Sequence, residues 1–440
     1  MRAAVWLGFP GIFDFVATGT VHGSEAYDAY AVNLLSTGVY GRDAGVPDAA
    51  LPPLYSLLLS AIYFVAGRSA LAVAAVHTAC DLASMAFLRR IASGLGCAPP
   101  AGTLAALGMA VYPYLVFQSL TVNDTSFFIL QLHAFVWLVV GLGLPDRRPG
   151  VVWRVVAAGV VLGLATLTRP VILPLLGWAV LWWTLRLPVR DVALRTVAIA
   201  ASATLVIGAW AARNARVYDE TVVIATNGGS NFWQGNNPRA HAYLAAGYDV
   251  QWISPGPLGE IDFRDPASNR EFMAEGLRFW RDHPGEIPAL LWTKFLVHWS
   301  IDVTPRRQPA SDAAVTPRGE DVRQVAGGDT VALSGLGPGH AVSAYAEPLF
   351  DRYGRLVHRS FWGLTLLLAF VGVWATRRGW RDVSLLWCVQ INMTLAYMVF
   401  HPSTRYRLPS DPLLMVFSAA GIVVLVAWAV RAARRVRPVR

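Results

Sequence analysis

Three carboxylates lie in short polar stretches of an otherwise apolar chain, where they could accept a proton or hold a ligand. Asp124 lies in "SLTVNDTSFFILQ", between two long apolar runs, and Glu25 and Asp28 lie three residues apart in "SEAYDAYAVNLL". A carboxylate in a partly desolvated site can have a raised pKa and then act as a general base. The alternatives are structural, because Asp124 could cap the helix that follows it and acids in a first helical turn often only complement the helix dipole.

Three arginines lie in equally short polar stretches. Arg169 lies in "TRP" at 168–170, and Arg405 and Arg407 lie in "HPSTRYRLPSDP". The guanidinium fork can bind phosphate oxygens through charge-assisted hydrogen bonds. Snorkelling toward the membrane surface, or pairing with a nearby acid such as Asp411, would explain the same arginines without a ligand. We expect a phosphate site, because all three arginines fall on one predicted face of the protein.

Aromatic and amide side chains could complete such a site. The stretch "TNGGSNFWQGNNP" contains Asn227, Asn231 and Asn236, and Tyr27 lies on the apolar face expected for the helix that begins at Ser24. Amides hydrogen-bond to hydroxyl groups, and aromatic rings pack against sugar faces. A simple Gly/Asn turn cluster would have the same composition.

Composition indicates a protein that crosses a membrane several times. The chain has 440 residues, of which 55% are hydrophobic and only 15% charged, against about 25% charged in soluble domains. Its net charge of +9 comes from arginines clustered in "FLRRIASG", "PDRRPG", "TRRGWRD" and "RAARRVRPVR". Arginine clusters at helix ends follow the positive-inside rule, so we expect no nucleic-acid partner. The three cysteines are far apart and predict neither a disulfide framework nor a metal site.

The apolar runs predict an all-α polytopic membrane protein with about ten spans of roughly 20 residues each. The predicted spans are 3–21, 70–88, 102–120, 125–144, 151–168, 170–186, 192–212, 359–375, 382–400 and 412–430. With the arginine clusters in the cytoplasm, both termini are cytoplasmic. Asp124, the first polar loop, "TRP" and "HPSTRYRLPSDP" then lie on the outer face of the inner (plasma) membrane.

This topology predicts three regions. Residues 1–212 form a transmembrane catalytic core with a surface helix at about 53–66, residues 213–355 form an extracytoplasmic region, and residues 356–440 form a transmembrane region with a basic tail. The apolar run "IPALLWTKFLVHWSIDV" is interrupted by Lys294 and His298. We therefore expect an amphipathic surface helix there.

Taken in order, these motifs resemble the bacterial GT-C glycosyltransferases. The resemblance rests on the acidic first loop, "PPLY", the acid Asp124, "TRP", "ARN" at 212–214, "TNGGSNFWQGNNP" and "RYRLP". Within these enzymes, the sequence is most similar to the branch of protein O-mannosyltransferases and lipid A aminoarabinose transferases. The resemblance implies a GT-C-like helical bundle and transfer of a hexose or pentose, with inversion, from a polyprenyl-phosphate donor to an extracytoplasmic glycan, lipid or protein.

The resemblance also assigns roles to residues. It implies that a first-loop acid is the base and that Asp124 is the family's second acid. Related sequences have an acid at the position of Gly23, so Glu25 or Asp28 must serve here, and Glu25 is preferred because it starts the helix. The sequence establishes no cofactor and no ligand spacing demands a metal, although Mg²⁺ or Mn²⁺ could bind between carboxylates and a phosphate. The chain has no "WWD", which disfavours the oligosaccharyltransferase branch.

Three other functions stay open. A transporter or flippase would suit many spans with His77, Asp81 and His133 in their interior, although an i,i+4 pair such as His77 and Asp81 is more often structural. An O-antigen ligase or polymerase would use a diphosphate-linked glycan instead. A noncatalytic relative would explain Gly23.

Overall fold

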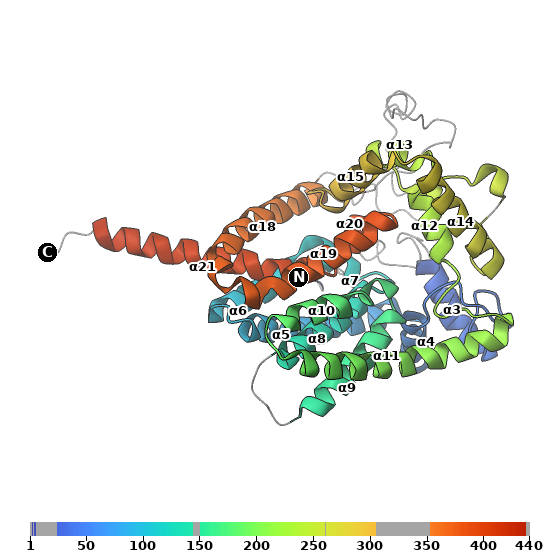
Figure 1. Cartoon of the computed structure of the whole chain (residues 1–440), viewed down its shortest axis with the longest axis horizontal. Helices are drawn as coiled ribbons and strands as arrows, with labels where there is room; N and C mark the ends of the chain where they lie inside the picture. Colours follow the sequence, from blue (N-terminus) through green and yellow to red (C-terminus); the bar gives the residue numbers. More distant parts are fainter. Residues whose placement is uncertain are drawn as a thin grey trace.

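The computed structural model describes residues 2, 4–5, 24–143, 150–259, 261–304 and 353–436, and every regular element in these ranges is helical (Figure 1). The predicted all-α class is therefore confirmed for the described part of the chain. The first predicted span, 3–21, and Gly23 lie almost entirely outside these residues. Glu25 is described only by its place on the backbone, and the predicted region 213–355 is described to residue 304.

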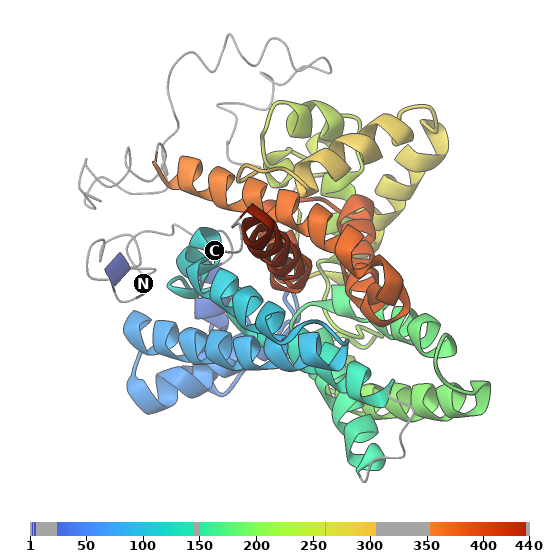
Figure 2. The same cartoon turned by 90° about the vertical axis from the view of Figure 1, so that its left-hand side faces the viewer.

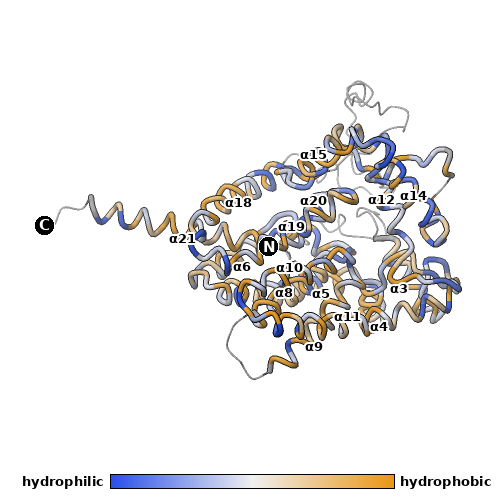
Figure 3. The backbone as a smooth tube through the Cα atoms, viewed as in Figure 1, coloured by the Kyte–Doolittle hydropathy of each residue, from blue (hydrophilic) through white to orange (hydrophobic). Residues whose placement is uncertain are grey.

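A bundle of apolar helices forms the body of the protein (Figures 1 and 3). Helix α18 packs along α21, α9 packs along α11, and α5 packs against both α6 and α8. Figure 2 shows α21 lying between α18 and α6. The bundle contains α5 (Ala70–Gly94), α6 (Pro99–Val111), α7 (Pro113–Ser119), α8 (Thr125–Leu142), α9 (Val151–Thr166), η2 (Pro170–Ile172), α10 (Leu175–Thr184), α11 (Val189–Tyr218), α18 (Arg355–Thr376), η7 (Arg377–Gly379), α19 (Trp380–Val399) and α21 (Asp411–Val436).

The number of membrane spans differs from the prediction. Five segments of the described chain are long and apolar enough to cross a membrane, namely α5, α8, α11, the 45-residue stretch over α18 and α19, and α21. The α6–α7 pair would make a sixth. Helix α9 has 16 residues and α10 has 10, fewer than the roughly 20 that a span needs. Helices occur at all the predicted spans from residue 70 onward, but the count of ten is not confirmed.

A bend between α6 and α7 directs the chain toward Asp124. The two helices differ in direction by 61°, and Pro113 begins the second one. Proline has no N–H to donate, so the hydrogen-bond ladder of α6 cannot continue through it. Tyr112, the residue at the break, donates its hydroxyl to Asp411 Oδ2 at 2.8 Å. The bend therefore ties the α6–α7 pair to the start of α21.

Helices α3 (Ser24–Thr37) and α4 (Leu54–Ala66) pack against each other beside the bundle. A helix is thus present where residues 53–66 were predicted to form one. Tyr55 and Leu59 are buried in a small core shared with α5, and the Leu54 amide donates to the Leu167 carbonyl at 3.0 Å. The first loop is therefore fastened to the end of α9, next to Arg169.

A compact helical subdomain covers the same end of the bundle, with its own apolar core (Figure 1). Gly229 of α12 lies against the backbone of α14, where a Cβ would meet the Asn269 carbonyl oxygen at 1.8 Å. Gly229 in "TNGGSNFWQGNNP" is therefore needed for helix packing at this point. The subdomain contains α12 (Gly228–Gly235), α13 (Ala240–Ala245), η3 (Val250–Trp252), η4 (Gly256–Leu258), α14 (Pro266–Asp282) and α15 (Ile287–His298).

The interpretation of α15 as an amphipathic surface helix was wrong about its polar residues. Lys294 and His298 are both fully buried. Lys294 Nζ donates to Asn236 Oδ1 at 2.8 Å and to the Phe400 carbonyl at 2.7 Å. Burial lowers the pKa of Lys294 to about 7. The polar side chains point inward because they join the subdomain to the end of α19.

Lys294 is the single lysine of the chain, which gives a direct test of this packing. We expect Lys294 to resist acylation by an amine-reactive reagent in the folded protein, because its amine has no solvent access. Peptide mass spectrometry after labelling measures the modification. The same reagent should label Lys294 fully after denaturation, and rapid labelling of the native protein would contradict the structure.

Candidate active site

A buried ion pair joins two segments that the sequence singled out separately. Asp124 precedes α8, and Arg169 lies in the turn between α9 and η2. Arg169 Nε donates to Asp124 Oδ2 at 2.7 Å while Nη2 donates to Oδ1, so the pair is bidentate. Nη2 also donates to Thr125 Oγ1 at 3.0 Å. Because both side chains are buried, this pair fixes the α8 start against the α9 end.

The Asp124 carboxylate does not cap α8. It accepts no hydrogen bond from a backbone N–H of the first turn. The amide of Thr125 instead donates to Asn123 Oδ1 at 2.9 Å. The capping explanation for Asp124 therefore fails, and its carboxylate is committed to Arg169.

The ionisation of Asp124 follows from this geometry. Burial raises the pKa of the carboxyl, but the charge and hydrogen bonds of Arg169 outweigh burial and hold the pKa below its ordinary value. Asp124 is therefore an anion at neutral pH rather than a base with a raised pKa. Its role in this structure is to hold and orient a buried cation.

Tyr27 and Arg405 share the electrostatic neighbourhood of this pair. Burial raises the pKa of Tyr27, and the charge of Asp124 raises it further, while Arg169 and Arg405 lower it. The Tyr27 ring packs edge-on against Tyr55 with centroids 5.0 Å apart. The structure thus brings α3, α8, the α9–η2 turn and the 403–407 segment to one place.

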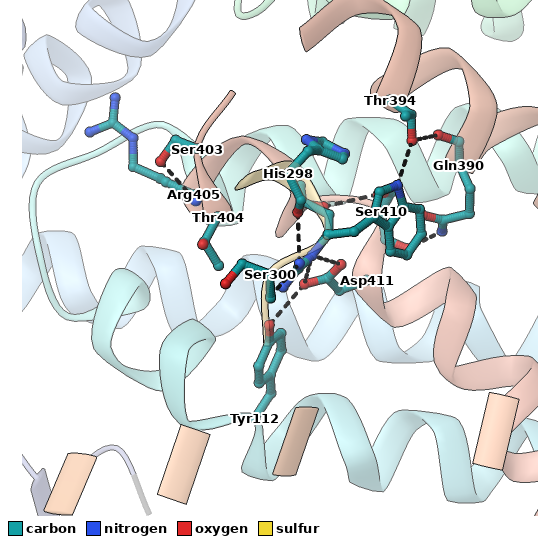
Figure 4. A network of polar contacts seen from close by, with 12 residues as sticks. Tyr112, His298, Ser300, Gln390, Thr394, Ser403, Thr404, Arg405, Ser410 and Asp411 are labelled. Atoms are coloured by element: carbon teal, nitrogen blue, oxygen red, sulfur yellow. Dashed lines mark hydrogen bonds and ion pairs between the residues drawn. The ribbon is translucent and has the colours of Figure 1, made fainter. Parts of the chain in front are cut away.

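Arg405 lies on α20 (Thr404–Arg407) with its side chain half-buried. Its guanidinium carbon lies 5.2 Å from the centroid of the Tyr406 ring. Figure 4 shows the Arg405 guanidinium pointing away from Asp411 and from the network around it. Arg405 therefore faces a different environment from Arg407, although only one residue separates them.

Arg407 is fully buried. Its Nε and Nη1 donors bind protein groups, whereas Nη2 has no hydrogen-bond partner within the described residues. Nε donates to Asp411 Oδ1 at 3.0 Å, and Nη1 donates to the carbonyls of His298 and Ser300 at 2.7 and 2.9 Å (Figure 4). The guanidinium also lies 4.1 Å from the centroid of the Trp362 ring. Arg407 therefore joins α15, α18 and α21, and its side chain has no exposed surface in this structure.

Of the two first-loop acids, the structure describes the side chain of Asp28 but not that of Glu25. Asp28 is buried, accepts the Tyr63 hydroxyl at 2.9 Å, and forms a bidentate pair with Arg68, with Nε at 2.9 Å. These contacts hold α3 on α4. Glu25 occupies the first turn of α3, two residues before Tyr27, and its side chain is not described.

The three asparagines singled out in "TNGGSNFWQGNNP" differ in burial. Asn236 is buried and accepts from both Trp280 and Lys294 at 2.8 Å, so it belongs to the subdomain junction. Asn227 and Asn231 are half-buried at the two ends of the first turn of α12. The structure does not bring Asn236 to the Asp124–Arg169 pair.

A cavity of about 560 Å³ opens beside Asn227. Its walls come from the 220–228 segment, the start of α14 and Pro170, which follows Arg169. Arg270 on its rim is paired with Glu220. The cavity therefore connects the subdomain surface to the turn that carries Arg169.

Sequence reasoning missed two residues that hold the first loop in place. Asp48 is buried, and its carboxylate accepts the Tyr30 hydroxyl and the backbone amides of Arg42 and Ala50. Arg213 of α11 donates to the carbonyls of Asp48 and Tyr40, each at 2.7 Å. In the sequence, only the "ARN" motif at 212–214 drew attention to Arg213, and it did not indicate which groups Arg213 binds.

The ionisable residues predicted inside the bundle contact other protein groups within the described chain. His77 Nε2 lies 3.0 Å from the Tyr55 hydroxyl, whereas Asp81 accepts from Arg2 at 2.6 Å. His77 and Asp81 therefore bind different partners and not each other. Among the described residues, no three His, Cys, Asp or Glu side chains are grouped so that they could hold a metal ion.

No family model and no curated protein sequence matches this chain. Among solved structures, it is similar to the oligosaccharyltransferase AglB from Archaeoglobus fulgidus in complex with an inhibitory peptide and a dolichol-phosphate. That match has a TM-score of 0.50 at 12% identity and covers 100% of this chain and 52% of AglB. ArnT from Cupriavidus metallidurans bound to undecaprenyl phosphate gives a TM-score of 0.39 at 12% identity, covering 96% of this chain and 77% of ArnT.

The AglB match establishes a likeness of fold. The chain therefore has a helical fold similar to that of AglB, and it spans about half the length of AglB. Membership of the GT-C superfamily stays a prediction. The mannosyltransferase branch stays a prediction. So does the exclusion of the oligosaccharyltransferase branch, because identity at this level shows the fold alone.

The Asp124–Arg169 pair should be strongly coupled in stability. We expect Asp124→Asn and Arg169→Gln each to lower the free energy of unfolding by about 3–5 kcal/mol, because each leaves a buried charge without its partner. The double variant should lose less than the sum of the two. Unfolding in detergent micelles measures all three, and additive losses would contradict the buried pair.

Proposed function

We propose that this chain is an integral-membrane glycosyltransferase that moves a sugar from a polyprenyl-phosphate donor to an acceptor on the extracytoplasmic face. The observation that carries the proposal is the meeting of Asp124, Arg169, Arg405 and Tyr27 at one end of an apolar bundle. A charged site at the end of apolar helices suits a donor whose tail lies in the bilayer and whose phosphate lies at its surface.

Arg405 and Arg169 bind the donor phosphate in this proposal. Arg169 Nη1 is buried and has no hydrogen-bond partner within the described residues, so one donor of the fork remains for a ligand. Arg405 supplies a second cation from the neighbouring segment. Cations positioned where charge develops on a leaving phosphate stabilise the transition state, so no acid needs to protonate it. Arg407 is left out of this role, because its side chain is fully buried and paired with Asp411.

Glu25 is the base in this proposal. An acceptor hydroxyl oxygen attacks the anomeric carbon from the face opposite the phosphate, and the bond from that carbon to the phosphate oxygen breaks. The hydroxyl proton passes to the Glu25 carboxylate, and polyprenyl phosphate leaves with the bonding electrons. One displacement of this kind inverts the anomeric carbon. Asp124 stays ionised and keeps Arg169 in position.

The acceptor enters through the cavity beside Asn227. The cavity is lined by apolar side chains together with polar ones such as Asn227 and Asn269, and it reaches Pro170, directly after the arginine that binds the phosphate in this proposal. Asn227, with Asn231 nearby on α12, contributes amides for acceptor or sugar hydroxyls, and Tyr27 offers a ring for packing. Its volume of about 560 Å³ is in the range of small-molecule sites, so it suits one sugar or a short peptide segment.

The comparison with AglB supports the lipid part of the proposal. AglB is described in complex with dolichol-phosphate and an inhibitory peptide, a polyprenyl phosphate together with an acceptor-like ligand. A divalent cation, Mg²⁺ or Mn²⁺, stays possible only between a donor phosphate and Glu25, because the described partner of Asp124 is Arg169.

The proposed base is tested by Glu25→Gln in proteoliposomes. We expect turnover, measured as release of polyprenyl phosphate from a panel of hexosyl and pentosyl donors, to fall about 10²–10⁴-fold while donor binding persists. Envelope glycans and glycoproteins from cells with and without the gene identify the acceptor by mass spectrometry.

The control is Glu271→Gln, which removes an exposed carboxylate from α14 and should leave turnover unchanged. Undiminished transfer by the Glu25→Gln protein would remove Glu25 from the mechanism. A wild-type protein that moves the donor between leaflets without cleaving it would identify a transporter.

Arg405 and Arg407 form a matched pair of variants. We expect Arg405→Gln to weaken donor binding about tenfold to a hundredfold with normal folding, which is the usual effect of losing a charge-assisted contact. Arg407→Gln should instead lower the yield of folded protein, because Asp411 would stay buried without its cation. Donor binding and thermal unfolding measured on both variants separate the roles. A folded Arg405→Gln protein with unchanged donor affinity would exclude Arg405 from the phosphate site.

A further inference from the structure

A second cavity lies at the opposite end of the bundle from Asp124. It has a volume of about 230 Å³, room for roughly eight water molecules. Its walls come from the end of α5, the end of α8 and the start of α9. Helix α8 runs from Asp124 to this cavity, so about 25 Å separates the two sites at 1.5 Å per residue. The cavity is therefore independent of the proposed active site.

Two arginines face this cavity from different helices and share one indole ring. The Arg90 guanidinium carbon lies 5.9 Å from the centroid of Trp137, and that of Arg154 lies 5.2 Å from it. Arg154 also lies 5.1 Å from the centroid of Trp153. Within the described residues, neither guanidinium has a hydrogen bond or ion pair with a carboxylate. Two cations therefore line one cavity without a described counter-charge.

Glycines make this arrangement possible. A Cβ on Gly141 would overlap the Arg154 guanidinium, and a Cβ on Gly94 would lie 2.6 Å from the Val140 side chain. Arg154 thus lies across α8 at Gly141, and a side chain at position 141 would displace its guanidinium. This packing holds the guanidinium at the cavity instead of leaving it in solvent.

The charges around the cavity are also positive. Arg89 precedes Arg90 on α5, and Arg195 of α11 donates to the Leu142 carbonyl at the end of α8. The described acids on the neighbouring helix starts are Asp191 and Asp382, and Asp382 is paired with Arg186. The local field therefore attracts an anion.

The flank of the cavity is apolar. Val152 and Val156 of α9 are exposed, as is Trp153 between them. Tryptophan at the end of an apolar helix is typical of the membrane interface, where acyl chains meet head groups. A ligand here would meet cations at its polar end and aliphatic side chains along its length.

We propose that this cavity binds the head group of an anionic phospholipid in the leaflet opposite the active site. The phosphodiester oxygens accept from Arg90 and Arg154 while the acyl chains lie along α9. Basic pockets between transmembrane helices bind lipid head groups by this combination of charge and apolar surface. The bound lipid supplies the counter-charge that the described protein lacks and joins α5, α8 and α9 at that end.

Native mass spectrometry of the purified chain tests the proposal. We expect phosphatidylglycerol to remain bound to the wild-type protein, and Arg90→Gln or Arg154→Gln to weaken its binding about tenfold each. Gly141→Ala should weaken binding as well, although it removes no charge. The matched control is Arg377→Gln, another arginine at this end of the bundle, which packs on Trp374 outside the cavity. Thermal unfolding of each variant identifies any that fails to fold.

Binding experiments with other ligands distinguish a lipid head group from other sources of phosphate. Zwitterionic phosphatidylcholine should bind more weakly than phosphatidylglycerol, and inorganic phosphate should not displace the bound lipid at millimolar concentration. Displacement by inorganic phosphate would identify a free-anion site and overturn the lipid assignment. Equal phosphatidylglycerol binding by the folded Arg90→Gln, Arg154→Gln and Arg377→Gln proteins would overturn the site itself.

Discussion

The structure depends on a constraint that apolar surroundings impose, namely that a buried charge must be paired. Asp124 and Arg169 are both buried, and each would be costly without the other. Their bidentate contact therefore fixes the start of α8 against the turn after α9, and the Leu54–Leu167 hydrogen bond adds α4 to the same turn. Helix α3, which carries Tyr27, packs on α4 and so depends on this contact, whereas α20, which carries Arg405, packs on α15 and α19.

The same constraint fastens the helical subdomain of α12 to α15. Lys294 and Arg407 are fully buried, and both donate across elements, the first to the end of α19 and the second to Asp411 on α21. The 403–407 segment that carries Arg405 lies between these two anchors. A half-buried arginine on a segment held at both ends can keep one orientation toward Asp124 and Arg169, and such preorganisation is what phosphate binding requires.

Much of the fold could be predicted because the apolar runs are long and their ends carry Gly, Pro and Arg. The location of Asp124 beside Arg169 and Arg405 also followed from topology. What could not be predicted was the choice of partners across the sequence. Asp28 with Arg68 and Lys294 with Asn236 are pairings that only tertiary packing decides, since no periodicity links residues so far apart. The Arg407–Asp411 pair is the exception, because i,i+4 spacing made it a visible alternative from the start.

The arginines of this chain include two groups, those paired with a buried carboxylate and those packed on an aromatic ring. Arg169 and Arg407 each face a buried carboxylate, and their first task is to keep that charge compensated. Arg90 and Arg154 rest on indole rings at the other end of α8, where the described chain offers them no acid. An aromatic face attracts a cation without neutralising it, so these two arginines still present positive charge to a ligand. Arg169 is paired with an acid and still has a donor to offer, because its Nη1 has no hydrogen-bond partner within the described residues. A cation that is held by an acid yet retains a donor can meet an incoming phosphate without moving, and in the proposed mechanism this lets the pair serve structure and phosphate binding together.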